Sequence, residues 1–164
     1  MSLTRRAAAG SLFAAGLAIG GAANARQHGG GMRAMFHRYV EQFNSGKPEG
    51  LAPFFAPDVV LNLPGRELIG AEAIVSHYRR SFAFLTEWLR VDTLIVDDRG
   101  LAAELYTRFT AHRDYPDFHA LPLKKNDVYI VTTFVLYEFD TRGRFTRIRP
   151  ALWQRDVSGV RSSD

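Results

Sequence analysis

The chain has 164 residues, no cysteine and a formal net charge of +4. The missing cysteine excludes a disulfide framework, a thiolate nucleophile and a cysteine metal site. The chain has only three lysines, and acidic residues flank the arginines of residues 142–149. A nucleic-acid partner is therefore not expected.

Residues 1–25 are predicted to be an export signal. Arg5 and Arg6 precede a short, weakly apolar run of alanine, glycine and leucine, and residues 23–25 form the A-x-A pattern of a cleavage site. The arginine pair favours twin-arginine export, although the Phe-Leu that usually follows such a pair is absent. A membrane anchor needs roughly 20 strongly apolar residues, so we expect a periplasmic mature chain without stable membrane insertion. The predicted organisation is a signal at 1–25, a flexible leader at 26–31, one folded domain at 32–156 and a flexible tail at 157–164.

The first half of the folded domain has mainly helical periodicity. Apolar residues recur at helical spacing over residues 32–45, and Pro48 begins a shorter helix that extends to Phe55. Residues 58–63 are predicted to form a strand, which Pro64-Gly65 closes with a turn. Gly70 then opens a third helix through Phe82.

The second half changes to a period of two. Strands are predicted at 88–96, 101–112, 127–139 and 144–155, with a long loop at 114–125. Helices followed by a run of antiparallel strands indicate an α+β fold in which the helices cover one face of a bent sheet.

The segment from Arg38 to Phe82 resembles the opening half of the nuclear transport factor 2-like superfamily. The landmarks are Tyr-Val, Asn-x-Gly, Phe-Ala and Ala-Ile pairs in matching order. The superfamily includes ketosteroid isomerase, the SnoaL polyketide cyclases and limonene epoxide hydrolase, and the resemblance continues to Trp153. It implies a cone-shaped barrel: a strongly bent, mostly antiparallel sheet with about three N-terminal helices on its concave face. It also implies no cofactor, no metal, and a homodimer or small homo-oligomer formed through the outer face of the sheet.

The resemblance assigns roles to two tyrosines but supplies no base. Tyr39 falls on the tyrosine that donates a hydrogen bond to the developing enolate in the isomerase, and Tyr78 matches the tyrosine that supports it. The position of the isomerase's aspartate base reads Leu63 here, and that of its second acid reads Val135. Because a leucine side chain cannot accept a proton, the reaction of these relatives cannot be transferred to this chain.

The implied pocket is apolar with hydroxyl groups on its wall, which suits a small hydrophobic or aromatic molecule. Arg66, near the opening, could bind a substrate carboxylate or phenolate, or form a surface ion pair. Asn62 lies on the opposite strand face from Leu63, so it enters the pocket only if a bulge shifts the register. The residues predicted to contact the substrate are Phe36, Asn62, Arg66, Thr107, Phe109, Tyr129, Thr133 and Trp153.

Five residues are candidates for the chemistry. Tyr39 and Tyr78 can stabilise an oxyanion or act as acid or base through a lowered pKa, or they can simply pack in the core. His77 titrates in the useful pH range, although a surface or capping role is the alternative. Asp117 and His119 share one side of a loop that could close the pocket, or they lie in a solvated turn.

These patterns lead to one main hypothesis and two alternatives. The first is a cofactor-independent enzyme that acts by acid/base chemistry on a small aromatic, terpenoid or polyketide-like substrate, as an isomerase, cyclase, hydratase or lyase. The superfamily also includes formaldehyde-releasing lyases of lignin-derived diarylpropanoids, and a tyrosine-rich cavity would suit such phenols. The alternatives are a non-catalytic periplasmic carrier of a small hydrophobic ligand and an assembly module.

Overall fold

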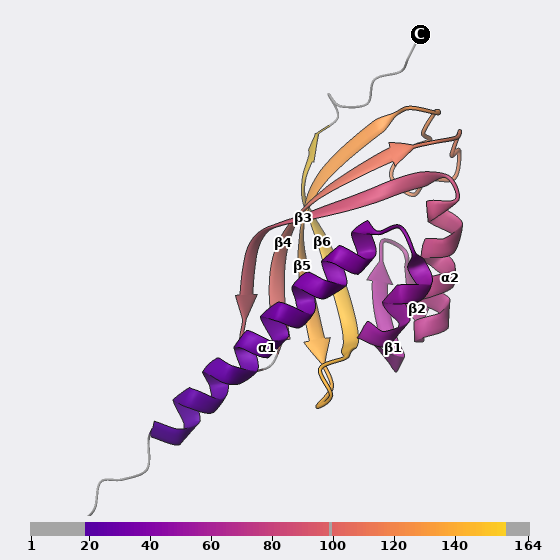
Figure 1. The fold of residues 1–164 in the computed structure, drawn as a ribbon. Helices are drawn as coiled ribbons and strands as arrows, with labels where there is room; N and C mark the ends of the chain where they lie inside the picture. Colours follow the sequence, from indigo (N-terminus) through magenta and orange to yellow (C-terminus); the bar gives the residue numbers. More distant parts are fainter. Residues whose placement is uncertain (1–18, 99, 157–164) are drawn as a thin grey trace, which may run out of the picture.

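Three helical segments and six strands make up the computed structural model, which describes residues 19–98 and 100–156 (Figure 1). Most of the predicted export signal and the predicted tail lie outside these residues. The helical segments are α1 (Ile19–Asn44), the 3-10 helix η1 (Pro48–Phe54) and α2 (Ala71–Phe82). The strands are β1 (Phe55–Leu63), β2 (Arg66–Ile69), β3 (Leu85–Val96), β4 (Gly100–Ala111), β5 (Val128–Phe139) and β6 (Phe145–Asp156).

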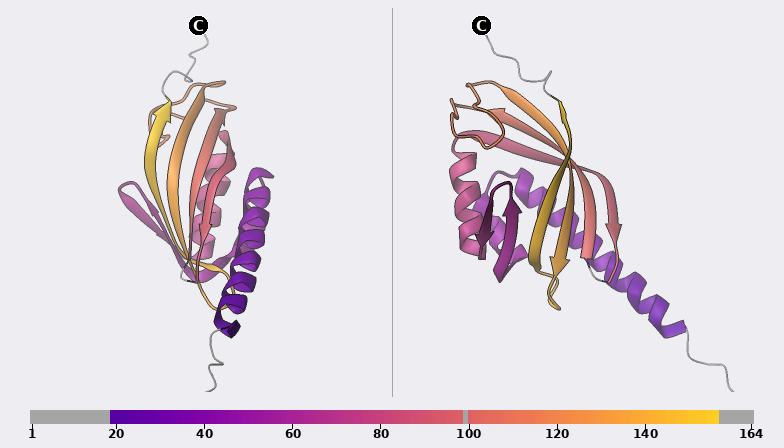
Figure 2. Two further views of the ribbon diagram at one scale, coloured as in Figure 1. Left: turned by 90° about the vertical axis from the view of Figure 1, so that its left-hand side faces the viewer. Right: turned by 180° about the vertical axis from the view of Figure 1, so that it is seen from behind.

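The six strands form one mixed sheet in the order β2-β1-β6-β5-β4-β3. The pairing of β1 with β6 is parallel, and the other neighbours are antiparallel. The strands bend strongly along their length without closing into a barrel, and α1 lies across the concave face (Figures 1 and 2). Helix α1 packs on β3, while α2 packs against η1, β1, β2 and β3. The predicted α+β fold with three helices and a strongly bent sheet is therefore confirmed.

The apolar stripe predicted for α1 is the part of the helix that meets the sheet. Met32, Phe36, Tyr39, Val40 and Phe43 are all buried, at the spacing of one helical face. All of them except Met32 belong to a main core cluster with the inner faces of β1, β3, β4, β5 and β6. A second buried cluster lies where the ends of β3, β4 and β5 meet the loop after β4. The interior thus consists of two packed regions.

Alternating burial confirms which residues of β4 face the interior. Leu101, Ala103, Leu105, Thr107 and Phe109 are buried on one side of the strand. Irregular pairing between β5 and β6 near Thr132 and Thr133 marks a bulge, which helps to bend the sheet.

Three strands differ from the predictions. Strand β1 begins at Phe55 rather than at residue 58. The sequence indicated only a turn between β1 and α2, but Arg66–Ile69 forms strand β2, because Pro64-Gly65 makes a tight hairpin turn with Gly65 at φ +75°. Strand β3 begins at Leu85 rather than at residue 88, which adds Glu87 to the sheet. Helix α1 begins at Ile19, so it includes residues 26–31, where the sequence predicted a leader.

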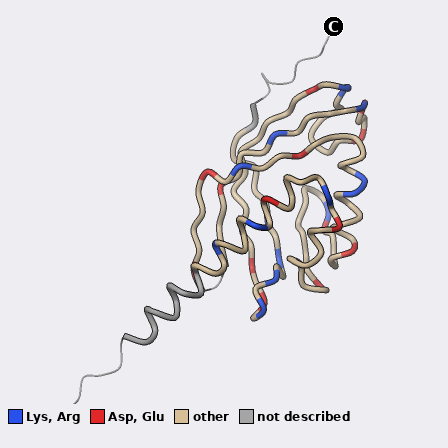
Figure 3. Tube along the Cα trace, in the orientation of Figure 1, with Lys and Arg blue, Asp and Glu red and all other residues tan. Residues whose placement is uncertain are grey.

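Two observations concern nucleic acid and membranes, neither of which is expected as a partner. Acidic and basic residues are mixed along the chain trace (Figure 3). None of the helices in the described ranges is long and apolar enough to cross a membrane.

Candidate functional site

The two hydrophobic clusters meet around a cavity of about 300 Å³. Its most buried wall comes from α1 and the inner faces of β1, β5 and β6, with Tyr39, Leu61, Tyr137 and Ile148. Exposed lining residues mark its opening: Pro64 and Arg66 from the β1–β2 hairpin, His119 from the loop after β4, and Leu152 from β6. The cavity therefore has a buried inner end, with phenols in its wall, and an open, polar mouth.

Glu87 is the single acidic residue among those that line the cavity. It lies between Leu85 and Leu89, both buried, so the alternation of β3 turns its side chain inward. No ion pair or hydrogen bond to its carboxyl is recorded among the described residues. Burial without a compensating cation raises the pKa of Glu87 to about 8. The carboxyl is therefore mostly protonated at pH 7 and ionises to become a base near pH 8.

Four tyrosines line the cavity with this carboxyl, and its charge affects the pKa of three of them, Tyr39, Tyr78 and Tyr137. Tyr39 and Tyr137 are each 3% exposed, with ring centroids 6.2 Å apart, and Tyr78 is half-buried. Burial raises the pKa of all three hydroxyls, and the charge of Glu87 adds to the effect. Of the two predicted roles for the Tyr39–Tyr78 pair, the structure therefore favours protonated hydrogen-bond donors over a phenol with a lowered pKa.

A tight aromatic packing fixes these phenols. Tyr39 contacts Phe145 edge-on at 4.9 Å between ring centroids, and Tyr78 contacts Phe43 in the same manner at 5.0 Å. Phe36, predicted to contact the substrate, is fully buried outside the cavity lining, with its ring 5.0 Å from that of Tyr137. Its place in the structure is behind the phenols, where it holds them in position.

A guanidinium and an imidazole, from Arg66 and His77, lie together at the mouth of the cavity. The Nη2 atom of Arg66 lies 3.2 Å from Nδ1 of His77. Because a guanidinium can only donate, Nδ1 accepts this bond and the imidazole proton lies on Nε2. Burial, followed by the nearby charges of Arg66, Arg80 and His119, lowers the pKa of His77 to about 4. His77 is therefore a neutral donor at pH 7.

The side chain of Asn44 anchors β3 to the end of α1. Its Nδ2 donates to the carbonyl oxygen of Leu89, and its Oδ1 accepts from the Leu89 amide, both at 2.8 Å. Strand β3 is an edge of the sheet, so this amide acts as the missing neighbour for its backbone. The anchor lies two residues from Glu87 and helps to place that carboxyl.

The structure brings most of the predicted site residues together. Arg66 faces the cavity because it pairs with Leu63 on one face of the β1–β2 hairpin, and both residues line the wall. Val135, the position of the second family acid, also lines it, so both of these positions present apolar groups. The predicted residues found in the lining are Tyr39, Arg66, His77, Tyr78, Thr107, Phe109, His119, Tyr129 and Thr133.

Other predicted residues lie elsewhere. The register shift in β1 precedes Val60, so Asn62 keeps the face opposite Leu63 and donates to Glu67. Asp117 is exposed and outside the lining, unlike its loop neighbour His119. Trp153 is 69% exposed and its ring meets that of Phe134.

Sequence reasoning missed Glu87, Tyr137 and Ser81, all of which line the cavity. The signal for Glu87 was the alternation Leu85, Glu87, Leu89, which becomes visible once β3 is extended back to residue 85. Tyr137 has the same parity as Val135, a residue that was already expected to face inward.

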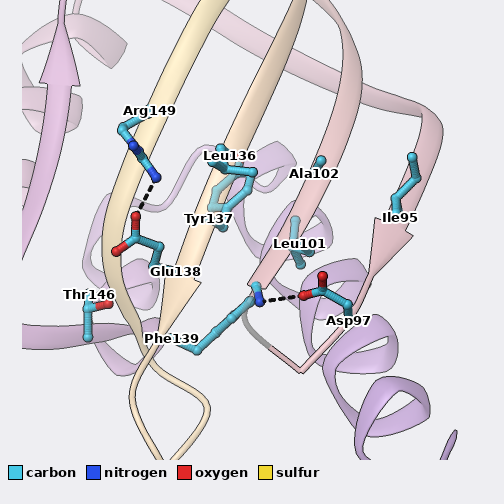
Figure 4. Close-up of a pocket in the computed structure, with 11 residues that line it drawn as sticks. Ile95, Asp97, Leu101, Ala102, Leu136, Tyr137, Glu138, Phe139, Thr146 and Arg149 are labelled. Atoms are coloured by element: carbon cyan, nitrogen blue, oxygen red, sulfur yellow. Dashed lines mark hydrogen bonds and ion pairs between the residues drawn. The ribbon is translucent and has the colours of Figure 1, made fainter. Parts of the chain in front are cut away.

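A second hollow, of about 400 Å³, lies near the turn between β3 and β4 (Figure 4). Its charged groups bond to one another or to backbone: Arg149 pairs with Glu138, and Asp97 accepts from the Gly100 amide at 3.0 Å. Both acids are exposed or half-buried and already hold a partner, so the cavity with Glu87 is the better candidate for chemistry.

Comparisons with known proteins bear on the fold. A family model described as a SnoaL-like domain matches residues 36–148. A structure from Xanthomonas campestris pv. campestris, provisionally named a polyketide cyclase, has a TM-score of 0.64 and 24% identity, and the match covers 76% of this chain and 90% of that one. A SnoaL-like polyketide cyclase from Agrobacterium tumefaciens strain C58 has a TM-score of 0.62 and 21% identity, with 78% and 93% covered. No curated protein matches the chain significantly. At these identities the two structures establish a common fold.

Proposed function

Because the chain belongs to the SnoaL-like domain family and its cavity is lined by one carboxyl and four phenols, we propose that it is a cofactor-free enzyme of the isomerase or cyclase type. Its substrate would be a small, largely apolar molecule with a carbonyl group. The observation that carries the proposal is Glu87, an acid in an apolar cavity whose pKa burial raises to about 8. General bases work best when their pKa lies near the working pH.

The reaction would begin with removal of a proton. The ionised Glu87 carboxylate takes a proton from the carbon next to the substrate carbonyl, and the electron pair of that C–H bond moves to the carbonyl oxygen. Tyr39 and Tyr137 donate hydrogen bonds to the resulting enolate oxygen, as oxyanion donors do in other enzymes. Their raised pKa values keep both phenols protonated for this role.

The second step would return the proton or form a bond. In an isomerase, the protonated Glu87 gives the same proton to a different carbon of the enolate. In a cyclase, the enolate carbon attacks a second carbonyl of the substrate, and the proton from Glu87 goes to the new alkoxide. Atoms balance in both cases without an oxidant, reductant or metal.

Finer alternatives use the same groups. A hydratase or lyase reaction on a phenolic or alicyclic substrate, including formaldehyde release from a diarylpropanoid, would need one base and the same hydroxyl donors. Incubation of the mature protein with a panel of these compounds, with products identified by mass spectrometry, separates these reaction types.

Deuterium exchange provides the direct test of the base. In D₂O, the wild type should exchange the α-protons of 2-tetralone faster than buffer does, with a rate that rises to about pH 8 and then levels. Glu87→Gln should lower the enzymatic rate by about 100-fold or more, since a general base typically contributes 10²–10⁴-fold. Glu104→Gln, an acid on the outer face of β4, is the matched control and should keep the wild-type rate. Equal rates for wild type and Glu87→Gln would reject the proposed base.

The carrier hypothesis has one observation in its favour, the apolar Leu63 and Val135 at both family acid positions. A carrier would bind 2-tetralone and related compounds with no exchange above the buffer rate. The same exchange experiment therefore decides between the two functions.

We also propose that the chain is exported and that it forms a homodimer. Sequencing the N-terminus of the secreted chain would test cleavage after Ala25. Exposed Trp88, Phe134, Leu136 and Trp153 give the outer side of the sheet an apolar character that suits a homodimer. Sedimentation of the wild type and of Phe134→Glu would test that surface.

A further inference from the structure

The residues at the mouth of the cavity indicate the charge of the ligand. We propose that the substrate is an organic monoanion, with a carboxylate or ionised phenol held at the mouth by Arg66 and His77 and an apolar body inside the cavity. The inference extends the proposed function by naming a substrate class. It rests on the proposed function only in that the bound molecule is called a substrate. The binding claim itself requires no turnover.

The first argument concerns the partners of Arg66. The other arginines that take part in ion pairs, such as Arg79 and Arg144, contact a carboxylate at 2.7–2.8 Å. For Arg66, the structure records one bond, to the neutral Nδ1 of His77, and no carboxylate within ion-pair distance among the described residues. The guanidinium therefore keeps donors for a ligand.

The hairpin geometry explains why this charge is not neutralised. Arg66 and Glu67 are adjacent in β2, so their side chains leave opposite faces of the strand. Glu67 instead accepts a hydrogen bond from Asn62 on the outer face. The hairpin thus turns its cation toward the cavity and its anion away from it.

The second argument concerns the neighbours of Arg66. His77 accepts from the guanidinium through Nδ1, so its Nε2–H is a further donor at the same place. His119 lines the mouth from the loop after β4, next to the ring of Phe118. Pro64 and Leu152 complete the opening with apolar surface. None of the mouth residues named here is acidic, and the one acid among the described residues that line the cavity, Glu87, comes from β3.

These features together specify the ligand. A guanidinium and an imidazole N–H recognise an oxyanion through charge-assisted hydrogen bonds. The wall behind them is mostly leucine, valine and aromatic side chains, which suit an apolar body. A neutral ligand of the same shape would fill the cavity but leave the guanidinium without a counter-charge.

Two compounds of equal shape test the proposal. 2-Naphthoate and 2-naphthamide differ in charge and little else, and their binding to the mature protein can be measured by calorimetry. The wild type should bind the naphthoate about 10-fold or more tighter than the amide, since a hydrogen bond to a charged group contributes about 1.5–3 kcal/mol. Arg66→Gln should abolish the preference and leave amide binding unchanged, while Arg66→Lys should keep part of it.

Arg80→Gln is the matched control. Arg80 lies on the exposed side of α2, outside the cavity lining, yet it is close enough for its charge to affect His77. The variant loses the same charge as Arg66→Gln and should keep the naphthoate preference. Thermal melts of all variants check that the fold is intact, and Arg66→Lys serves if Arg66→Gln fails to fold.

Several outcomes would overturn the inference. Equal affinity of the wild type for both compounds, an intact preference in Arg66→Gln, or no binding of either compound up to about 1 mM would each do so. These results are independent of the proposed base: loss of exchange in Glu87→Gln without a charge preference rejects the anion site alone. A charge preference that depends on Arg66, in a protein with no exchange activity, rejects the enzyme alone.

Discussion

Glu87 on β3 and His77 on α2 line the same cavity, and burial changes their pKa values in opposite directions. The pKa of Glu87 rises to about 8, and that of His77 falls to about 4. Both residues are therefore mostly neutral at pH 7, because a poorly solvated site disfavours the charged form of acid and base alike. Arg66 keeps its charge, since a guanidinium is not deprotonated in proteins. The comparison teaches that β3 offers the cavity a latent base, while Arg66 at the mouth offers a permanent cation.

After Glu87→Gln, the largest effect should come from removing the phenol hydroxyl of Tyr39. Tyr39→Phe should lower the exchange rate with 2-tetralone by about 100-fold, which corresponds to about 2.7 kcal/mol of lost stabilisation of the enolate. Initial rates followed by NMR in D₂O provide the measurement. Tyr106→Phe, on the outer face of β4 beneath Arg90, is the control and should leave the rate unchanged. A normal rate in Tyr39→Phe would remove this phenol from the mechanism.

The next prediction concerns the free energy of unfolding and Glu87. In the folded state the carboxyl stays protonated up to about pH 8, whereas in the unfolded chain it ionises near 4.5. The folded state therefore binds more protons between these pH values, and the wild type loses stability as the pH rises through this window. Glu87→Gln lacks this loss.

Urea unfolding of both proteins from pH 4 to pH 9 measures the difference. The advantage of Glu87→Gln over the wild type should grow by about 2 kcal/mol across the window, a value that allows for water entering the open cavity. A difference that is constant with pH would mean that the carboxyl titrates normally.

The success of sequence reasoning followed the length and regularity of each element. The helical stripe of α1 and the alternation along β4 span many residues, so their inward faces could be predicted, and Tyr39, Thr107 and Phe109 with them. Strand β2 has four residues, too few for a periodic signal to be distinguished from a loop.

The proposed base, Glu87, was not predicted from the sequence, for a different physical reason. Alignment with relatives directs attention to Leu63 and Val135, and both do line the cavity, but the carboxyl comes from β3 instead. The start of β3 is hidden because Glu87 has low strand propensity and the strand begins only three residues after the end of α2 at Phe82. Pairing of Glu87 with Phe109 across the sheet, a tertiary interaction, extends the strand to Leu85.

The anchor at Asn44 should have a smaller effect on stability. Asn44→Ala removes both bonds to the Leu89 backbone and should lower the free energy of unfolding by about 1.5 kcal/mol. Asn44→Asp keeps the acceptor for the Leu89 amide but places a carboxylate oxygen opposite the Leu89 carbonyl oxygen, so it should cost at least as much in stability. Urea unfolding at pH 7 compares the variants. Exchange activity that falls more than the loss of folded protein would show that the anchor also positions Glu87; unchanged stability in Asn44→Ala would contradict the structural role.

The smallest expected effect concerns His77, the second residue of the comparison. His77 binds a proton below about pH 4 in the folded state but near pH 6.5 in the unfolded chain. The unfolded state therefore binds more protons between these values, and the wild type loses stability as the pH falls through the window. His77→Gln should remove about 1 kcal/mol of this dependence, since the imidazole is only half-buried. His37→Gln, at an exposed position of α1, is the control in the same urea titrations. If the stability of His77→Gln follows that of the wild type at every pH, the conclusion that His77 is a neutral imidazole would be wrong. If the stability differences from the wild type change with pH in opposite directions for the Glu87 and His77 variants, burial favours the neutral form of both residues.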